Sequence, residues 1–515
     1  MTEGVRLSEL LASLSLATDI GMGQPMEQAL RTCLLSLGIA RELGCSEEDC
    51  EDVYYLALLR FSGCTAHAHE DAIENGGDEM ALRGALAPIL GAQGREAIGQ
   101  YLRHLGEGLP GPTRARLIVA ALTGGARKQR EIVASSCEVA QMMARRLGLG
   151  EGLVSALGYA FEHYNGKGMP RGAKDEEIPI SARISAVARD CDVFYRVEGW
   201  DLAEEALRER RGRAYDPRVT DAFLEEGRRL LKELDDRPVW DAVIAADPTT
   251  ISLTGPRLDE ALRCIGDFAD LKCSFTRGHS PKVVSLSEAA GAGMGLSAAE
   301  VGPVRAAAQV QEIGKTGTPN GILEKPNPLS PNEWERIRLH TYLTERILAR
   351  SDALAEVAAL ASGHHERLDG SGYHKGAKGG QIARGARVLA AADAYVAMTS
   401  ERPWRPARSP SEAADQMKKE VADGRLDHAA ADAVLAAAGQ ATRSRRGTWP
   451  AGLSDREVEV LRLISRGSSN REVADLLVIS PKTVGRHVEN IYAKIGVSTR
   501  AGATMYAVQH DLISD

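Results

Sequence analysis

Apolar residues recur at helical spacing along most of the chain. Clear examples are LRTCLLSLGIARELG (30–44), VAQMMARRLGLGEGLVSALGYAF (139–161) and DALAEVAALA (352–361). Apolar positions three and four residues apart place a hydrophobic stripe on one face of a helix. No stretch shows the sustained alternation of apolar and polar residues that is typical of strands. The pattern therefore predicts a mostly α-helical protein.

Two segments rich in turn-forming residues interrupt the helical pattern. They are DPTTISLTGPRLDE (247–260) and GQATRSRRGTWPAG (439–452), and the second carries a basic cluster at Arg443, Arg445 and Arg446. A chain of 515 residues exceeds the length of about 250 to 300 residues at which a single core stops growing. We therefore expect helical domains at 1–250 and 255–440, a basic linker at 441–451 and a small helical domain at 452–515.

The first two segments look like diverged copies of one unit. Two pairs of blocks correspond: ALLRFSGC (57–64) with AQVQEIGK (308–315), and NGKGMPRGA (165–173) with DGSGYHKGA (369–377). An arginine follows the glycine-rich block at the same distance in both segments, at Arg183 and Arg387. Shared glycines at a shared spacing predict tandem domains with one fold.

Charge and cysteine usage narrow the function classes. The formal net charge is −8, so no basic field covers the whole chain, and contact with nucleic acid depends on a local patch. The eight cysteines are scattered without a C-x-x-C pair, which predicts reduced core thiols. No apolar run approaches the roughly 18 residues of a membrane span, and the N-terminus lacks a secretory signal pattern. We expect a cytoplasmic protein without membrane contact.

The second copy concentrates residue types that bind metal ions. Its histidines include His279, His340 and the adjacent pair His364-His365, and Asp393 follows in a later helical segment. Neutral imidazoles and carboxylates spread over several helices suit a two-metal hydrolase, in which the cations polarise a phosphate and lower the pKa of a bridging water. A single histidine is more often a surface or capping residue, so the prediction depends on the combination.

Three stretches of this copy, EIGKTGTPNGILEKPNPLSPNEW, HHERLDGSGYHKG and ARVLAAADAYVAMTSERPWR, resemble the HD-GYP domain. That domain belongs to the HD-superfamily phosphohydrolases and is associated with cyclic di-GMP. The resemblance implies a divalent metal (Fe, Mn or similar) and a cyclic dinucleotide or other phosphate-bearing nucleotide as ligand. It also implies metal ligands at His279, Glu312, His340, His364, His365 and Asp393, with Lys315 as the lysine that contacts the substrate phosphate.

Two positions depart from the pattern of that family. Gln311-Glu312 stand where the family has its defining His-Asp pair, and His374 stands where its third motif has proline. A glutamine carbonyl is a weaker ligand than imidazole, and glutamate extends one methylene further than aspartate. We therefore expect single-ion occupancy without efficient two-metal hydrolysis. Lys315, Arg367 and Arg387 accompany the histidines and the glycine-rich loop, a combination that still suits a phosphate-bearing ligand.

The first copy has lost the ligand set. Alignment of the copies places Arg31, Arg60-Phe61, Cys137, Ala160-Phe161 and Arg189 at the ligand positions. None of these residue types suits a hard metal ion. The glycine-rich block persists at Gly166 and Gly168. We therefore expect a degenerate domain that keeps the fold without the metal site.

Helix start signals recur in the C-terminal segment. Ser454 with Glu457 predicts a capping box, Ser480 before a proline predicts an N-cap, and Ser498 is expected to open the last helix. A short helix, a tight turn and a second helix with polar residues near its start are typical of a helix-turn-helix.

This segment resembles the LuxR-type DNA-binding domain through its pattern S-x-K-T-V-x-x-H-V-x-x-I-x-x-K. The resemblance implies DNA-binding residues at Ser480, Lys482, Thr483, Val484, Arg486, His487 and Lys494. We expect Arg486 at the major groove and Lys494 at the DNA backbone, while Val484 also belongs to the predicted core. Gly485 replaces a residue that is usually basic, which costs the helix about 1 kcal/mol.

Two hypotheses about function follow. The first is a bacterial transcription regulator, in which tandem HD-GYP-like domains sense a ligand or metal and control a module that binds double-stranded DNA as a homodimer. The second is a metal-dependent phosphodiesterase or phosphohydrolase that acts on cyclic di-GMP or a related nucleotide. The pair Gln311-Glu312 separates them, because efficient hydrolysis needs a complete two-metal site.

Overall fold

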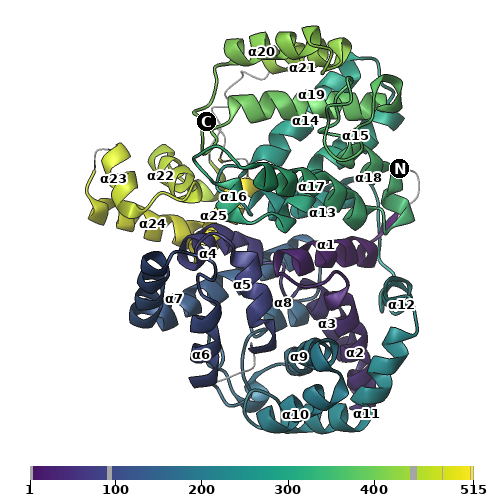
Figure 1. The fold of residues 1–515 in the computed structure, drawn as a ribbon, viewed down its shortest axis with the longest axis vertical. Helices are drawn as coiled ribbons and strands as arrows, with labels where there is room; N and C mark the ends of the chain where they lie inside the picture. The colour runs from purple at the N-terminus through teal and green to yellow at the C-terminus, as the bar shows by residue number, and fades with distance from the viewer. Residues whose placement is uncertain (1–3, 90–94, 441–448, 478, 511, 514–515) are drawn as a thin grey trace. The chain divides into compact units, whose positions relative to one another are not determined.

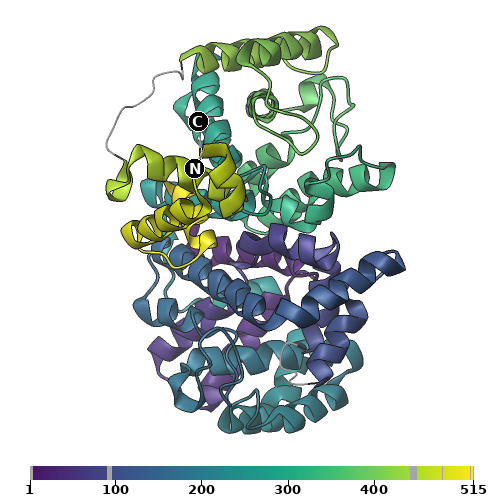
Figure 2. The same cartoon turned by 90° about the vertical axis from the view of Figure 1, so that its left-hand side faces the viewer.

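The computed structural model describes residues 4–89, 95–440, 449–477, 479–510 and 512–513. The predicted basic cluster of Arg443, Arg445 and Arg446 lies outside these described residues. Helices make up nearly all of the regular structure (Figures 1 and 2), which confirms the mostly α-helical class. The chain divides into two compact units, one of residues 6–253 and one of residues 254–515 with the first five residues.

The N-terminal unit contains the first copy. Its chain ends meet at the short strands β1 (Val5–Arg6) and β2 (Ser252–Leu253), and the Leu7 N–H donates to the Ile251 carbonyl (2.8 Å). The helices are α1 (Leu7–Gly21), α2 (Gln28–Glu42), α3 (Glu47–Leu59), α4 (Ala68–Asn75), α5 (Glu79–Leu86), α6 (Arg95–His104), α7 (Gly111–Arg146), α8 (Glu151–Leu157), α9 (Ile180–Glu198), α10 (Trp200–Arg210), α11 (Pro217–Asp235) and α12 (Val239–Ala245). Short 3₁₀ turns are η1 (Cys64–His67), η2 (Ala87–Ile89) and η3 (Asp175–Glu177).

The other unit contains the second copy, followed by the C-terminal module. The helices of the copy are α13 (Gly255–Asp270), α14 (His279–Gly293), α15 (Ala298–Val310), α16 (Asn320–Leu323), α17 (Pro331–Leu348), α18 (Ala355–Ser362), α19 (Arg384–Thr399), α20 (Pro410–Ala422) and α21 (His428–Gln440). Its 3₁₀ turns are η4 (Ile313–Gly317), η5 (Asp352–Leu354) and η6 (Gly379–Gln381).

The two copies repeat one arrangement of helices. Helices α2 and α14 each have 15 residues, and α3 and α15 each have 13. Both α3 and α15 begin in the same way, because the Ser46 N–H donates to Asp49 (3.3 Å) and the Ser297 N–H donates to Glu300 (2.8 Å). Packing repeats as well: α2 contacts α3 and α9, while α14 contacts α15 and α19. The chain therefore has tandem domains of one fold, as predicted.

The C-terminal module is a bundle of four helices: α22 (Asp455–Ser465), α23 (Asn470–Leu477), α24 (Pro481–Ile495) and α25 (Arg500–Gln509), after the 3₁₀ turn η7 (Pro450–Gly452). The capping box of Ser454 and Glu457 and the N-cap at Ser480 are confirmed. The last helix begins one residue later than predicted, because Thr499 rather than Ser498 accepts the N–H of Gly502 (3.1 Å).

All eight cysteines are free thiols, and five of them are buried. The predicted core position therefore holds for these five, whereas Cys45, Cys50 and Cys64 are half-buried. Within the described ranges, none of the helices combines the length and apolar character needed to span a membrane.

Candidate functional site

The second copy brings its histidines together through a close approach of two elements. The ideal Cβ of a residue at position 314 would lie 2.0 Å from the His340 carbonyl oxygen, so only glycine fits between η4 and α17. The Gly314 N–H donates to the Thr344 hydroxyl (3.1 Å), which itself donates to the Gln311 carbonyl (2.9 Å). These bonds fix the end of α15 beside His340.

His340 and His364 face each other with defined ring protons. Their Nδ1 atoms lie 2.6 Å from the carbonyl oxygens of Ile337 and Ala361. Since a carbonyl oxygen only accepts, each Nδ1 carries the proton and each Nε2 presents a lone pair. The two Nε2 atoms are 3.2 Å apart, and burial lowers the pKa of His340 to about 3. Two such atoms at this distance are suited to binding one cation.

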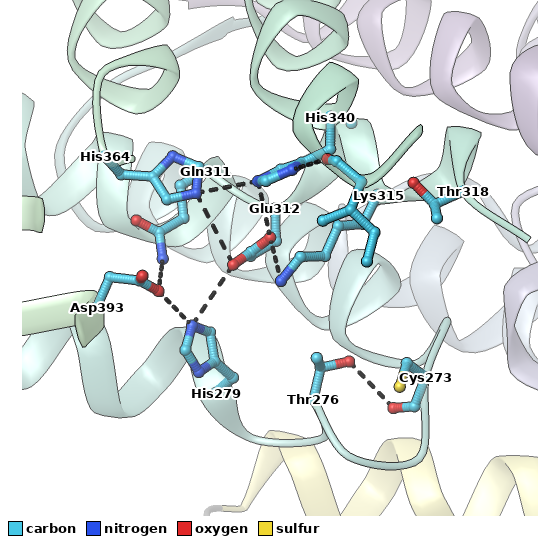
Figure 3. Close-up of polar contacts among 12 residues, drawn as sticks. Cys273, Thr276, His279, Gln311, Glu312, Lys315, Thr318, His340, His364 and Asp393 are labelled. Carbon is cyan, nitrogen blue, oxygen red and sulfur yellow. Dashed lines mark hydrogen bonds and ion pairs between the residues drawn. The ribbon is translucent and has the colours of Figure 1, made fainter. Parts of the chain in front are cut away.

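Glu312 lies in the middle of the cluster (Figure 3). Its carboxylate is 2.7 Å from Lys315 Nζ, 3.6 Å from His279 Nε2 and 3.8 Å from His340 Nε2. Burial would raise the pKa of Glu312, but Lys315 and the histidines outweigh it and lower the pKa to about 2. The carboxylate of Glu312 therefore lies within the cluster, where the sequence analysis placed it as a candidate ligand.

Asp393 forms the opposite side of the site. Its Oδ1 accepts from His279 Nε2 (2.9 Å) and from the side-chain amide of Gln311 (3.3 Å), and its Oδ2 is 3.7 Å from His365 Nδ1. Burial would raise the pKa of Asp393, but the His279 hydrogen bond and the charge of His365 outweigh it, so the pKa lies well below the usual value. Asp393 is therefore an ionised acceptor.

The predicted ligands form two groups whose ligand atoms lie within 4.8 Å of one another: His340, His364 and His365, and His279, Glu312 and Asp393. His279 Nδ1 and Gln311 Oε1 are buried without a hydrogen-bond partner. Imidazoles and carboxylates in this number suit a transition metal. The residues therefore fit a divalent ion, although Gln311 directs an amide N–H at Asp393 where the family has an imidazole ligand.

His374 and Arg387 of the second copy make their contacts outside the cluster. His374 is within hydrogen-bond distance of the Thr341 hydroxyl (3.0 Å) and the Glu345 carboxylate (3.2 Å). Arg387 donates to the carbonyls of Ile382 (2.9 Å) and Gly379 (3.0 Å) and pairs with Asp427 (3.0 Å). Arg387 is therefore occupied in holding the loop before α19. Lys315 pairs with Glu312 in the cluster, and the charge of Arg367 acts on His365.

Two residues that the sequence analysis missed shape the glycine-rich loop. The buried Glu366 accepts the backbone N–H groups of Lys375 (3.0 Å) and Ala377 (2.9 Å). Tyr373 packs on His365 with ring centroids 4.3 Å apart. The available signal for Glu366 was its counterpart Glu162, which precedes the glycine-rich block of the first copy at the same distance and accepts the N–H of Arg171 (2.6 Å).

The structure corrects two matches in the first copy. Helix α2 starts at Gln28 as α14 starts at His279, so Gln28 and not Arg31 stands at that ligand position. An added Cβ at Gly63 would lie 1.8 Å from the Ser136 carbonyl oxygen. In the second copy, an added Cβ at Gly314 would clash in the same way with the His340 carbonyl oxygen. Ser136 rather than Cys137 therefore matches His340.

In the C-terminal module six of the seven predicted DNA-binding residues lie at the start of α24, and Lys494 lies in its last turn. Ser480, Lys482, Thr483 and Arg486 are exposed, and His487 is half-buried. Val484 is fully buried and has no side-chain surface for DNA. Lys494 Nζ donates to the Gly452 carbonyl (3.0 Å) and pairs with Glu457 (2.7 Å), so its charge is engaged within the module. A Cβ at Gly485 would meet no atom within 4 Å.

Two family profiles match the chain. The profile described as "HD domain" matches residues 119–219 and 263–430, and the profile described as "Bacterial regulatory proteins, luxR family" matches residues 451–507. The chain therefore belongs to the HD-domain family and carries a luxR-type module at its C-terminal end.

Similar proteins are cyclic-dinucleotide phosphodiesterases. The 3'3'-cGAMP-specific phosphodiesterase 3 of Vibrio cholerae is 30% identical over 407 residues, which cover 78% of this chain and 88% of that relative. A cyclic di-GMP phosphodiesterase of Thermotoga maritima is 38% identical over 148 residues, 28% of this chain and 39% of that relative. The crystal structure of a cyclic GMP-AMP-specific phosphodiesterase from V. cholerae has a TM-score of 0.59 at 26% identity, covering 85% of this chain and 98% of that one.

Proposed function

We propose that the protein is a transcription regulator that binds double-stranded DNA through α24 and a phosphate-bearing nucleotide through its second HD copy. The observation that carries the proposal is the combination of an exposed polar helix start in a luxR-type module with a buried histidine and carboxylate cluster whose His-Asp pair is replaced. DNA as the partner implies a cytoplasmic location. Homodimerisation is part of the proposal, since one module offers few base contacts and symmetric pairing doubles them.

The metal in this proposal is one divalent ion, iron, manganese or similar. His340, His364 and His365 would hold it, with Glu312 as an acidic neighbour. When bound, such an ion polarises a phosphate oxygen and lowers the pKa of a bound water. Lys315, which is paired with Glu312 at 2.7 Å, provides a positive charge for a phosphate at the edge of the cluster. The relatives act on cyclic dinucleotides, and this proposal extends that ligand class to the chain.

A second candidate function is hydrolysis of a cyclic dinucleotide. It is favoured by one observation: the carboxylates of Glu312 and Asp393 still lie together with His279 as a second possible ligand group. The two functions differ in metal content and turnover. Metal analysis of the purified full chain, together with an assay for cyclic di-GMP and 3'3'-cGAMP hydrolysis, distinguishes them.

Replacing His364 and His365 with alanine tests the role of the cluster. We expect the double variant to lose bound metal and to weaken cyclic dinucleotide binding by about tenfold or more, since each ring supplies one ligand atom. Inductively coupled plasma mass spectrometry and calorimetry measure the two effects. His428→Ala is the control, because that histidine is exposed on α21. Unchanged metal and ligand binding in the double variant would contradict the proposed site.

Arg486→Ala and Lys494→Ala separate base recognition from module stability. We expect Arg486→Ala to lose about 1 to 3 kcal/mol of binding on the preferred site and to relax its sequence preference. Lys494→Ala breaks the pair with Glu457, so it should lower the melting temperature of the module and change DNA affinity mainly through folding. Fluorescence anisotropy at fixed salt and thermal denaturation report the two effects. Equal affinity losses on all sequences in both variants would show that α24 does not recognise bases.

A further inference from the structure

In the first copy, positive charge occupies the place of the metal ligands. Arg60 matches Gln311 and follows α3, and Arg189 in α9 matches Asp393. Both side chains are buried, with 7% and 2% of their surface exposed. Arg189 therefore places a guanidinium group in the first copy where the second copy has the carboxylate of Asp393.

Among the described residues, the carboxylate that pairs with this cluster is Asp190, which several groups share. Asp190 pairs with Arg189, lies 3.7 Å from Arg210 and accepts a hydrogen bond from the Tyr215 hydroxyl (2.7 Å). Burial would raise the pKa of Asp190, but the guanidinium groups of Arg189 and Arg210 outweigh it and lower the pKa. Within the described part of the chain, Arg60 lacks a carboxylate at ion-pair distance, although the charge of Asp190 still acts on it.

Arg60 also has nitrogen atoms without acceptors. Its Nε and Nη1 are buried and make no hydrogen bond. The guanidinium carbon lies 5.6 Å from the ring centroid of Phe61 and 5.3 Å from that of Phe161. The two ring faces stabilise a cation, but they do not satisfy two N–H groups. Burial and the like charge of Arg189 lower the pKa of Arg60 to about 10, so it remains charged near neutral pH.

Gln28 is a second buried donor without an acceptor, and it favours the same kind of ligand. Gln28 stands at the position of His279 and is 2% exposed, and its Nε2 has no partner while its Oε1 accepts from Arg196. Ser136 and Ala160 take the positions of His340 and His364, so two imidazole rings are replaced by small side chains. Phe61 and Phe161 take the positions of Glu312 and His365, and their ring centroids are 5.9 Å apart. The buried donors of Arg60 and Gln28 without acceptors call for an acceptor-only group.

We propose that the first copy contains an anion site that binds a phosphoryl group at Arg60, with Gln28 as a second donor. A phosphate or phosphate ester supplies the acceptor oxygens that Arg60 lacks and a negative charge at ion-pair distance from its guanidinium group. The site uses the location of the ancestral metal centre with the opposite charge preference. It is independent of the metal and nucleotide binding proposed for the second copy.

The test is calorimetry with inorganic phosphate on the full-length chain, treated with a chelator and carrying H364A/H365A so that the second copy does not contribute. We expect phosphate to bind this background and to raise its melting temperature. Adding Arg60→Gln gives the first copy the glutamine that stands at position 311 of the second. This change should weaken phosphate binding at least about tenfold, because a hydrogen bond to a charged group is lost. GMP and cyclic di-GMP as parallel probes distinguish free phosphate, a monoester and a diester as the source.

Two further variants separate the effect of charge from that of donor geometry and provide a control. Arg60→Lys keeps the charge but not the two-pronged donor and should give intermediate affinity. Arg229→Gln, at a half-exposed arginine of α11, should leave binding unchanged. Without phosphate, Arg60→Gln should raise the melting temperature, since it removes a buried charge that lacks a carboxylate at ion-pair distance. The proposal is overturned if Arg60→Gln binds phosphate like its background, if the background binds none, or if Arg60→Gln lowers stability with no phosphate effect in either protein.

Discussion

Exchanging Gln311-Glu312 for the His-Asp pair of the family is expected to raise the metal content from about one ion per chain to about two, and cyclic dinucleotide hydrolysis by about 100-fold. The reason lies in the contact between Gln311 and Asp393. The Gln311 amide donates an N–H to Asp393 Oδ1 (3.3 Å) and thus presents a hydrogen where a ligand needs a lone pair. An imidazole at position 311 restores that lone pair. Metal analysis and product formation from cyclic di-GMP and 3'3'-cGAMP measure the change.

The single variants show which residue limits the site. Glu312→Asp alone should have the smaller effect, because the Glu312 carboxylate already lies 3.6 to 4.0 Å from three histidine nitrogens. Gln311→His alone should account for most of the gain in metal. If the parent chain already holds two ions and turns over rapidly, the single-ion proposal is wrong and the phosphodiesterase function replaces it.

Gly314→Ala is expected to have the largest effect on the metal centre of any single methyl addition. The new Cβ would lie 2.0 Å from the His340 carbonyl oxygen and 2.7 Å from the Thr344 nitrogen, both of which belong to backbone. Separating η4 from α17 should cost about 1 to 3 kcal/mol or more in unfolding free energy. It also moves His340 away from Glu312, so metal affinity should fall by about tenfold or more. Thermal denaturation and metal analysis measure both losses.

Two other glycines provide matched controls. Gly63→Ala creates the same clash in the first copy, with a Cβ 1.8 Å from the Ser136 carbonyl oxygen, so it should lower stability while metal content stays unchanged. Gly302→Ala in α15 meets no atom within 4 Å and should be neutral or slightly stabilising. Normal metal binding by Gly314→Ala would show that the close approach does not position His340.

Local interactions made the helix starts predictable. The caps at Ser454 and Ser480 depend on residues three positions apart, which the sequence displays directly. The sequence alignment of the two copies wrongly placed Arg31 and Cys137 opposite His279 and His340, because no local signal marks their positions. Both lie inside helices without turn markers. A shift of three residues, as at Arg31, keeps much of the same apolar stripe, and no local signal fixed the one-residue shift at Cys137. Only the bounds of α2 and the packing of Gly63 on Ser136 fixed the register.

Partners far along the chain were not predictable. Lys494 pairs with Glu457, 37 residues away, and Arg387 pairs with Asp427, 40 residues away. Sequence patterns show that such a residue is charged but not whether the fold already uses the charge. The residue types of the metal cluster were predictable because histidine and aspartate at that spacing are rare. The central position of Glu312 in the cluster was not predictable from the sequence, because it depends on how far α15 extends towards α17.

The two copies also separate the positions that build this fold from those that perform its chemistry. The first copy has lost the metal ligands, yet it keeps the close-approach glycine Gly63, the loop-holding Glu162 and the cap formed by Ser46 and Asp49. The two copies thus share the residues on which the backbone depends and differ at the ligand positions. A domain of this fold can therefore keep the glycine-rich loop and its glutamate without the side chains for metal chemistry. Only the ligand positions themselves distinguish an active enzyme from a domain recruited for another purpose.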